Sequence, residues 1–219
     1  MGRPKEHDDQ TRIALRAAAE RLVAEGGADA LSVRAVADLA GTTTRAVYSV
    51  FGSKEGLVAA LAQTAFELLH SGIEARPETE DPVADLVDAG VTVFRGLVRD
   101  HPALYRIAFQ RIVPGLQAGA ELTEARERAF AQLQAKVRRI QDAGLLGRKP
   151  VRDAALEVNA MMEGLANAEL RGATLRLLPA GEEERVWRDA LTTVIRGFTA
   201  TAPTGRQQRR RLGDIRRDG

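Results

Sequence analysis

Apolar side chains recur at intervals of three and four residues along almost the whole chain, which is the spacing of one face of an α-helix. The stripe is clearest within residues 83–99, where it comprises Leu86, Val87, Gly90, Val91, Phe94, Leu97 and Val98. No run of Val, Ile and Thr is bounded by turn signals as a strand would be. The pattern therefore predicts an all-α fold of about nine helices.

Glycines, prolines and capping residues divide the pattern into separate helices. Gly26-Gly27 ends the first helix, and Gly41 ends the second. The predicted helices cover about residues 11–25, 32–39, 43–51, 53–70, 83–99, 104–112, 122–143, 152–171 and 183–200.

The predicted helices before about residue 57 are short, whereas those that follow are longer and more apolar. We expect a polar N-terminal arm over residues 1–10 and a domain of three short helices over residues 11–56. A helical bundle over 57–202 and a disordered, Arg-rich tail over 203–219 complete the predicted organisation, because the tail is too polar to build a core.

Composition excludes several classes of protein. The chain has no Cys, so disulfides and thiolate metal sites are impossible. Its start is polar and lacks the apolar core of a signal peptide, and no stretch reaches the roughly 20 apolar residues of a membrane span. We expect a soluble, unexported, cytoplasmic protein with no membrane partner.

The basic charge of the chain comes from its end. Residues 1–56 hold eight Lys or Arg and eight Asp or Glu, whereas the tail 205–219 holds six Arg and two Asp. The net charge of +2 therefore does not by itself indicate nucleic-acid binding. Any such inference depends on where particular side chains lie.

The second and third short helices have the pattern of a helix-turn-helix motif. Gly41 provides the tight turn, and Val36 and Val47 are apolar where the two helices pack. At the exposed start of the third helix, Thr43, Thr44 and Arg45 can meet base edges, while Tyr48 and Lys54 can reach phosphates. Arg45 matters most because a guanidinium pairs bidentately with guanine.

Three of these candidates also have a plain structural interpretation. Thr43 is as well suited to capping the third helix as to contacting a base, and it can do both. Tyr48 can pack its ring in the core with the hydroxyl reaching outward. Arg34, on the second helix, can be an ordinary solvated charge.

The same segment resembles the TetR/AcrR-type bacterial transcriptional regulators. The matching residues are Ala17-Ala18, Ser32-Val33-Arg34-Ala35-Val36-Ala37, Ala40-Gly41 and Val47-Tyr48-Ser49-Val50-Phe51-Gly52-Ser53-Lys54-Glu55-Gly56-Leu57. The resemblance implies that Tyr48 and Lys54 contact the DNA backbone and that the start of the third helix reads bases. It implies a DNA-facing set of Ser32 or Arg34, Thr43, Thr44, Arg45, Tyr48 and Lys54.

The resemblance further implies a helical ligand-binding domain whose last two long helices pair with those of a second subunit. Candidates for an effector pocket are mostly apolar, with a few polar groups, as in other sites between helices. They are Phe66, Val87, Val91, Phe94, Val98, Tyr105, Phe109, Leu133, Asn159, Met161, Met162, Glu163 and Asn167. Each apolar member has core packing as the alternative.

A twofold dimer is expected because a single helix-turn-helix covers few base pairs, whereas a dimer engages two half-sites. The candidate interface residues on the last two helices are Ala155, Val158, Leu165, Val186, Trp187, Leu191, Val194, Ile195 and Phe198. A core within one chain would show the same pattern.

The sequence therefore predicts a ligand-responsive DNA-binding regulator, with an operator duplex, a small apolar or amphipathic effector and a second copy as partners. Two alternatives stay open: non-specific DNA binding through the Arg-rich tail, and a helical bundle without DNA function. No enzyme or cofactor motif is present, and we expect no catalytic residue. His70 with Glu67 and Glu74 has the spacing of a metal site, but such groups on a surface helix are usually solvated, so we expect no metal.

Overall fold

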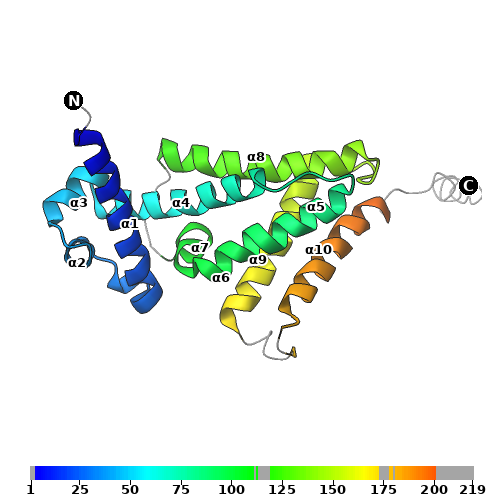
Figure 1. The fold of residues 1–219 in the computed structure, drawn as a ribbon. Helices are drawn as coiled ribbons and strands as arrows, with labels where there is room; N and C mark the ends of the chain where they lie inside the picture. The colour runs from blue at the N-terminus through cyan, green and yellow to red at the C-terminus, as the bar shows by residue number, and fades with distance from the viewer. Residues whose placement is uncertain (1–2, 111, 113–118, 173–177, 180, 201–219) are drawn as a thin grey trace, which may run out of the picture. The chain divides into compact units, whose positions relative to one another are not determined.

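The computed structural model describes residues 3–110, 112, 119–172, 178–179 and 181–200. The described residues form helices joined by turns and contain no strand (Figure 1). The prediction of an all-α fold is therefore confirmed. The predicted tail lies outside the described residues, as do residues 1–2 of the predicted arm.

The N-terminal helices begin and end at residues with clear local causes. They are α1 (Arg3–Ala30), α2 (Val33–Leu39), α3 (Thr44–Phe51) and α4 (Lys54–Glu74). The regular part of α1 ends at Gly27, whose φ of 71° interrupts the helix where the sequence predicted its end. However, α1 begins at Arg3 rather than near Thr11, because Pro4 in the first turn costs no helical hydrogen bond.

The later helices follow the predicted order with two differences. They are α5 (Pro82–Ala89), the π-helical turn η1 (Gly90–Phe94), α6 (Arg95–Asp100), α7 (Pro102–Phe109), α8 (Ala120–Asp142), α9 (Val151–Arg171) and α10 (Glu183–Ala200). The predicted helix over 83–99 is thus interrupted by a π turn. The predicted helix over 104–112 ends at Phe109, so Ile112 lies beyond it.

The chain forms two compact units. The first contains residues 1–75 and 93–132, that is α1 to α4, α6, α7 and the first part of α8. Its core is built by α1, α4 and α7, which pack against one another. The fully buried side chains there include Leu15, Leu57, Leu61, Tyr105, Leu104 and Ile107. The functional division predicted at residue 56 stays a prediction.

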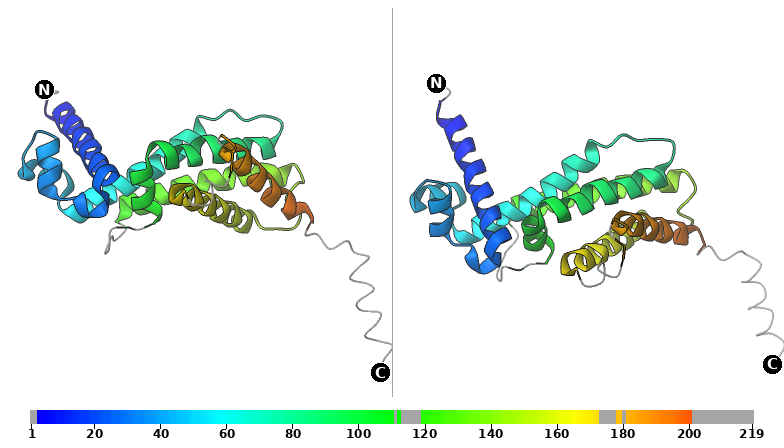
Figure 2. Two further views of the ribbon diagram at one scale, coloured as in Figure 1. Left: turned by 90° about the horizontal axis from the view of Figure 1, so that it is seen from below. Right: turned by 60° about the horizontal axis from the view of Figure 1, so that its bottom comes forward.

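The second unit contains residues 76–92 and the described residues between 133 and 200, that is α5, the rest of α8, α9 and α10. Helices α9 and α10 run side by side in both views of Figure 2, and α10 also packs on α5. The contact with α5 is close at Gly90, where an added Cβ would lie 2.5 Å from Leu191 Cδ1 and 3.3 Å from Met162 Sδ. Only glycine fits there without a shift.

A polar clasp closes the loop before α5 within the second unit. Asp85 is buried on α5 and accepts hydrogen bonds from the Thr79 backbone N–H, the Thr79 hydroxyl and the Arg139 guanidinium. Arg139 also donates to the Thr79 carbonyl, and Lys136 pairs with Glu78. We call Thr79, Asp85 and Arg139 the Asp85 clasp.

None of the helices in the described part of the chain has an apolar stretch of membrane-spanning length.

Candidate functional site

The turn between α2 and α3 has the geometry of a helix-turn-helix. The Ser32 hydroxyl caps α2 by accepting a hydrogen bond from the Ala35 N–H at 3.1 Å. After α2, Gly41 adopts a φ of 65°, and the Thr42 N–H donates to the Ala37 carbonyl at 2.9 Å. Val47 is fully buried where α3 packs on α2. This packing fixes the face of α3 that points outward.

The outward face of α3 carries the predicted reading residues. Thr43, Thr44, Arg45 and Tyr48 are all exposed, and the Tyr48 side chain is 54% exposed. The interpretation of Tyr48 as a core residue is therefore wrong. The Thr43 hydroxyl caps α3 by accepting from the Ala46 N–H at 3.2 Å, which leaves its methyl group and a second lone pair for other contacts.

Ser49 is a further exposed residue on this face that sequence reasoning missed. It follows Tyr48 and lies one turn after Arg45, so the helical spacing of Thr44, Arg45, Tyr48 and Ser49 could have revealed it.

Arg34 on α2 lies in an ion pair with Asp38, with 3.9 Å between Nε and Oδ2. Both side chains are well exposed, so the pair is weak in solution. The guanidinium therefore remains available to a phosphate, and the alternative of a solvated surface charge also stays open.

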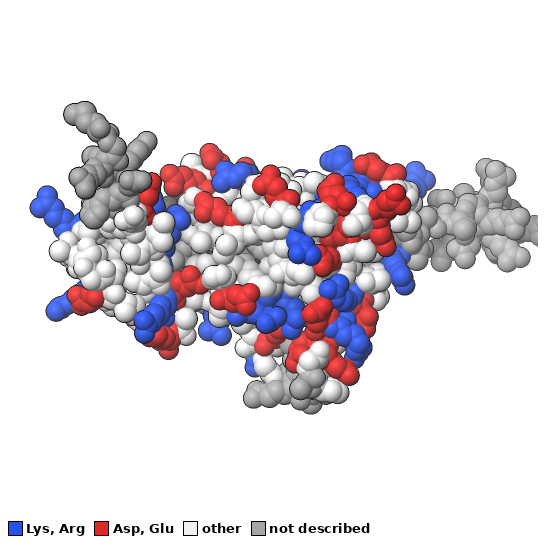
Figure 3. Space-filling model, viewed as in Figure 1, with Lys and Arg blue, Asp and Glu red and all other residues white. Residues whose placement is uncertain are grey.

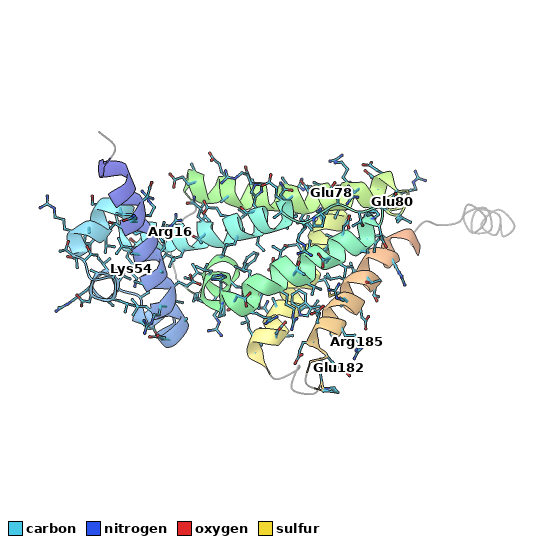
Figure 4. The ribbon with its side chains drawn as sticks, viewed as in Figure 1. Arg16, Lys54, Glu78, Glu80, Glu182 and Arg185 are labelled. Carbon is cyan, nitrogen blue, oxygen red and sulfur yellow. The ribbon has the colours of Figure 1, made fainter. Side chains whose placement is uncertain are left out.

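The start of α4 holds Lys54 beside a capped helix end. The Ser53 hydroxyl accepts a hydrogen bond from the Gly56 N–H at 3.0 Å. The pKa of Glu55 lies below its ordinary value because its own backbone N–H and the Ser53 hydroxyl donate to the carboxylate. Lys54 is half-buried at the first position of the helix, on the same unit as α3 (Figure 4).

Two arginines of α1 that sequence reasoning did not single out lie near this helix end. The Arg12 guanidinium carbon lies 6.0 Å from the centre of the Phe51 ring, at the end of α3. Arg16 follows one turn later (Figure 4), with its Nε buried and without a hydrogen-bond partner among the described residues. Their spacing of four residues on α1 is the signal that could have found them.

Gly56 is required by the close approach of α3 to α4. A Cβ at this position would lie 2.0 Å from the Phe51 carbonyl oxygen, and a backbone atom cannot rotate away. We expect Gly56→Ala to destabilise the protein by about 1–3 kcal/mol because the start of α4 must shift. Chemical denaturation followed by circular dichroism measures this loss.

Gly96→Ala is the control for this prediction, because an added Cβ at Gly96 meets nothing within 4 Å. It should be neutral or stabilise α6 by up to about 1 kcal/mol through helix propensity. Equal stabilities for the two variants would contradict the crowding at Gly56.

Four effector candidates meet in the first unit. Phe66 of α4, Phe94 of η1, and Tyr105 and Phe109 of α7 form an aromatic cluster. Tyr105 stacks on Phe109 with 5.0 Å between ring centres, and Phe66 lies 5.2 Å from Phe109. The Arg126 guanidinium carbon lies 5.4 Å from the centre of the Phe66 ring, and the candidate Val98 is buried in the same unit.

The other effector candidates belong to the second unit. Val87, Val91, Leu133 and Met162 are buried there. The remaining candidates, Asn159, Met161, Glu163 and Asn167, are half-buried on α9. Asn159 donates a hydrogen bond to Glu163 at 2.6 Å, so this carboxylate has a partner on its own helix.

Most of the predicted dimer residues are core residues of a single chain. Ala155, Val158, Trp187, Leu191, Ile195 and Phe198 are buried within the second unit, where α9 packs on α10. The prediction that they form an interface is corrected, because a second copy cannot cover side chains that are already sealed. Leu165, Val186 and Val194 are half-buried and remain candidates.

Besides charged residues, the exposed positions of α9 and α10 that sequence reasoning passed over include small or apolar residues. On α9 they are Leu156, 48% exposed, with Ala160 and Gly164. On α10 they are Thr193 and Gly197. With Val186 and Val194 they are what these helices offer to a partner.

The described residues hold no group of three or more potential metal ligands among His, Asp and Glu. His70 lies 3.7 Å from Glu74, between Nε2 and Oε2, while the Glu67 carboxylate accepts from Gln63 at 2.6 Å. The spacing on α4 therefore does not gather the three side chains.

Comparison with known families agrees with this geometry. Residues 15–61 match the family described as bacterial regulatory proteins, tetR family, and residues 87–194 match the tetracyclin repressor-like C-terminal domain. The chain belongs to the TetR family. It is a TetR-family transcriptional regulator, and α2 and α3 form the helix-turn-helix of its N-terminal part.

Solved structures of the same fold are numerous. PfmR of Thermus thermophilus is 22% identical with a TM-score of 0.63, over 83% of this chain and 97% of that one. GusR of Salmonella enterica is 22% identical with a TM-score of 0.69, over 87% and 96%. The fatty acid degradation regulator FadR of Bacillus halodurans is 17% identical with a TM-score of 0.68, over 84% and 94%. At these identities the likeness shows the fold alone.

No curated protein matches the chain closely enough to count as a relative.

Proposed function

We propose that this TetR-family protein binds a palindromic operator as a homodimer, represses transcription from it, and is released by a small apolar or amphipathic effector. The DNA-binding part of this proposal is supported by the exposed face of α3, which presents Thr44, Arg45 and Tyr48. Such residues have no role in packing, whereas all three are suited to DNA. Arg45 is suited to guanine, and the other two to bases or phosphates.

The surface charge supports local contacts rather than a broad electrostatic attraction. The face of the N-terminal helices seen in Figure 3 is largely uncharged, with a few separate basic and acidic side chains on it. Affinity from counterion release alone would need many basic residues. We therefore assign sequence reading to α3 and phosphate contacts to Tyr48, Lys54 and Arg34.

The proposed homodimer uses the outward faces of α9 and α10. Leu156, Ala160 and Gly164 of α9, with Val194 and Gly197 of α10, are the residues that a second copy can cover. A twofold dimer supplies one copy of α3 for each of the two half-sites of a palindromic operator. Analytical ultracentrifugation of the wild type against Gly164→Arg tests this assignment: the variant should be monomeric.

The proposed effector region in the first unit is the aromatic cluster of Phe66, Phe94, Tyr105 and Phe109. Residues from three separate elements meet in it, so an apolar molecule inserted among these rings would displace α7 relative to α4. By thermodynamic linkage, the effector weakens operator binding only to the extent that effector and operator prefer different conformations of the protein.

The experiment that tests DNA binding is selection of bound sequences from random duplex DNA by the purified protein. We expect a palindromic consensus. For a duplex carrying it, Arg45→Ala should weaken binding by about 5-fold to 150-fold per half-site, since a bidentate Arg–guanine contact is worth roughly 1–3 kcal/mol. Fluorescence anisotropy at fixed salt measures the affinity.

The matched control is Arg21→Ala, which removes an exposed arginine that is paired with Glu25 on α1. It should leave the affinity unchanged. If Arg45→Ala behaved like Arg21→Ala, and deletion of residues 205–219 removed binding instead, non-specific binding through the tail would be the correct function.

A further inference from the structure

A polar side-chain contact joins α1 to the corner between α6 and α7, in addition to the packing of α1 on α7. His101 Nδ1 lies 2.7 Å from Glu20 Oε1, although the two residues are far apart in sequence. The side chains are 41% and 27% exposed. Both residues belong to the first unit, so the contact lies within one compact body. We call this pair the corner latch.

The position of His101 makes the latch sensitive to the direction of α7. His101 ends α6 by donating its N–H to the Leu97 carbonyl, and its own carbonyl accepts from the Tyr105 N–H at 3.1 Å. Its φ of −131° and ψ of 54° turn the chain, and α7 starts at Pro102. The imidazole ring of His101 caps neither α6 nor α7, so the turn between these helices forms without the contact between the ring and Glu20.

The latch lies between the two regions that carry the proposed function. Tyr105, one turn after His101, stacks on Phe109 in the aromatic cluster. On the other side, α1 packs against α2 and α3, which carry the reading face. A shift of α7 caused by a molecule among the aromatic rings would therefore change the distance from His101 to Glu20.

We propose that the corner latch is a proton-dependent coupling element: with a protonated imidazole it holds α1 in the arrangement that binds operator, and it loosens when the imidazole is neutral. This inference rests on the proposed function. Imidazole is the side chain that ordinarily changes charge between pH 5 and 8, and a carboxylate such as that of Glu20 attracts the charged imidazolium more strongly than the neutral ring, which can donate only a hydrogen bond. The latch is thus stronger below that range and weaker above it.

The described parts of the elements that pack there carry other charged side chains as well. On α1, Arg16 lies one turn before Glu20, while Arg21 is held by Glu25. The buried face of α4, which packs on both α1 and α7, is apolar. Arg99 and Asp100 at the end of α6 are exposed, and Arg106 on α7 is half-buried.

The test measures the affinity for the selected duplex at pH 5.5 and pH 8.0 and at constant ionic strength. The chain has three histidines, so few groups titrate in this interval. We expect the wild type to bind the duplex more tightly at pH 5.5 than at pH 8.0, by about two- to five-fold for each protomer. This is the size of effect expected from one partly exposed ion pair. Glu20→Gln and His101→Gln should each remove the difference, and the double variant should match the single ones.

The matched controls are His70→Gln and His7→Gln, which should keep the pH dependence of the wild type. Binding without pH dependence in the wild type, or pH dependence that survives in His101→Gln, would overturn the latch. A wild type that binds no duplex at either pH would instead overturn the proposed function. Thermal unfolding by circular dichroism verifies that each variant folds, and Glu20→Asp, whose shorter side chain withdraws the carboxylate, replaces Glu20→Gln if the latter does not.

Discussion

Replacing Trp187 by Ala is expected to destabilise the protein by about 3–5 kcal/mol, the usual range for removing a large buried aromatic side chain. Trp187 is 0% exposed on α10 and packs within the second unit. Its indole N–H donates to Glu169 on α9 at 2.8 Å, so the substitution removes both a large buried surface and a link between the two helices. Urea denaturation followed by circular dichroism measures the loss.

Two control variants separate packing from hydrogen bonding at this position. Trp187→Phe keeps most of the ring but loses the donor, and it should cost about 1–3 kcal/mol. Arg152→Ala changes an exposed residue at the start of α9 in the same unit and should stay within about 0.5 kcal/mol of the wild type. A loss below about 1 kcal/mol for Trp187→Ala would contradict its place in the core.

Trp187 also shows what a helical pattern can and cannot predict. The spacing of Trp187, Leu191 and Ile195 correctly identifies the buried face of α10. It does not say whether the covering surface belongs to the same chain or to a second copy, because both bury apolar side chains alike. The sequence therefore predicted an interface where the structure has the contact between α9 and α10.

The DNA-binding motif could be predicted almost completely because its determinants are local. Ser32 and Thr43 cap helices within three residues, and Gly41 adopts the positive φ that the turn needs. Helix capping and the turn at Gly41 depend on residues that are close in sequence, so they can be predicted from the sequence alone.

Contacts between distant segments could not be predicted in the same way. His101 and Glu20 are separated by most of the first unit, and Asp85 and Arg139 by two intervening helices. Many charged residues have suitable partners elsewhere in the chain, and only the packing of the helices selects among them. The corner latch and the Asp85 clasp thus became visible only with the fold.

The Asp85 clasp leads to the second large prediction. Asp85→Ala should destabilise the protein by about 3 kcal/mol, because it leaves Arg139 and the Thr79 N–H without the carboxylate that accepts from them. Glu80→Gln is the matched control, since Glu80 is an exposed acid in the same loop (Figure 4). It should change the free energy of unfolding by less than about 0.5 kcal/mol.

The same carboxylate predicts a dependence of stability on pH. Burial alone would raise the pKa of Asp85, but hydrogen bonds from Arg139 and Thr79 outweigh it and lower the pKa from 3.8 to about 2. Because the pKa is lowered on folding, Asp85 stabilises the fold fully at pH values above the pKa that it has in the unfolded chain, about 4. This contribution is lost as the pH falls towards the folded-state pKa of about 2. Between pH 5 and pH 2 the wild type should therefore lose about 2 kcal/mol more than Asp85→Asn, which has no proton to take up. The free energy of unfolding is measured by urea denaturation at each pH. If it fell equally for the two proteins over this range, Asp85 would not be held by the clasp in solution.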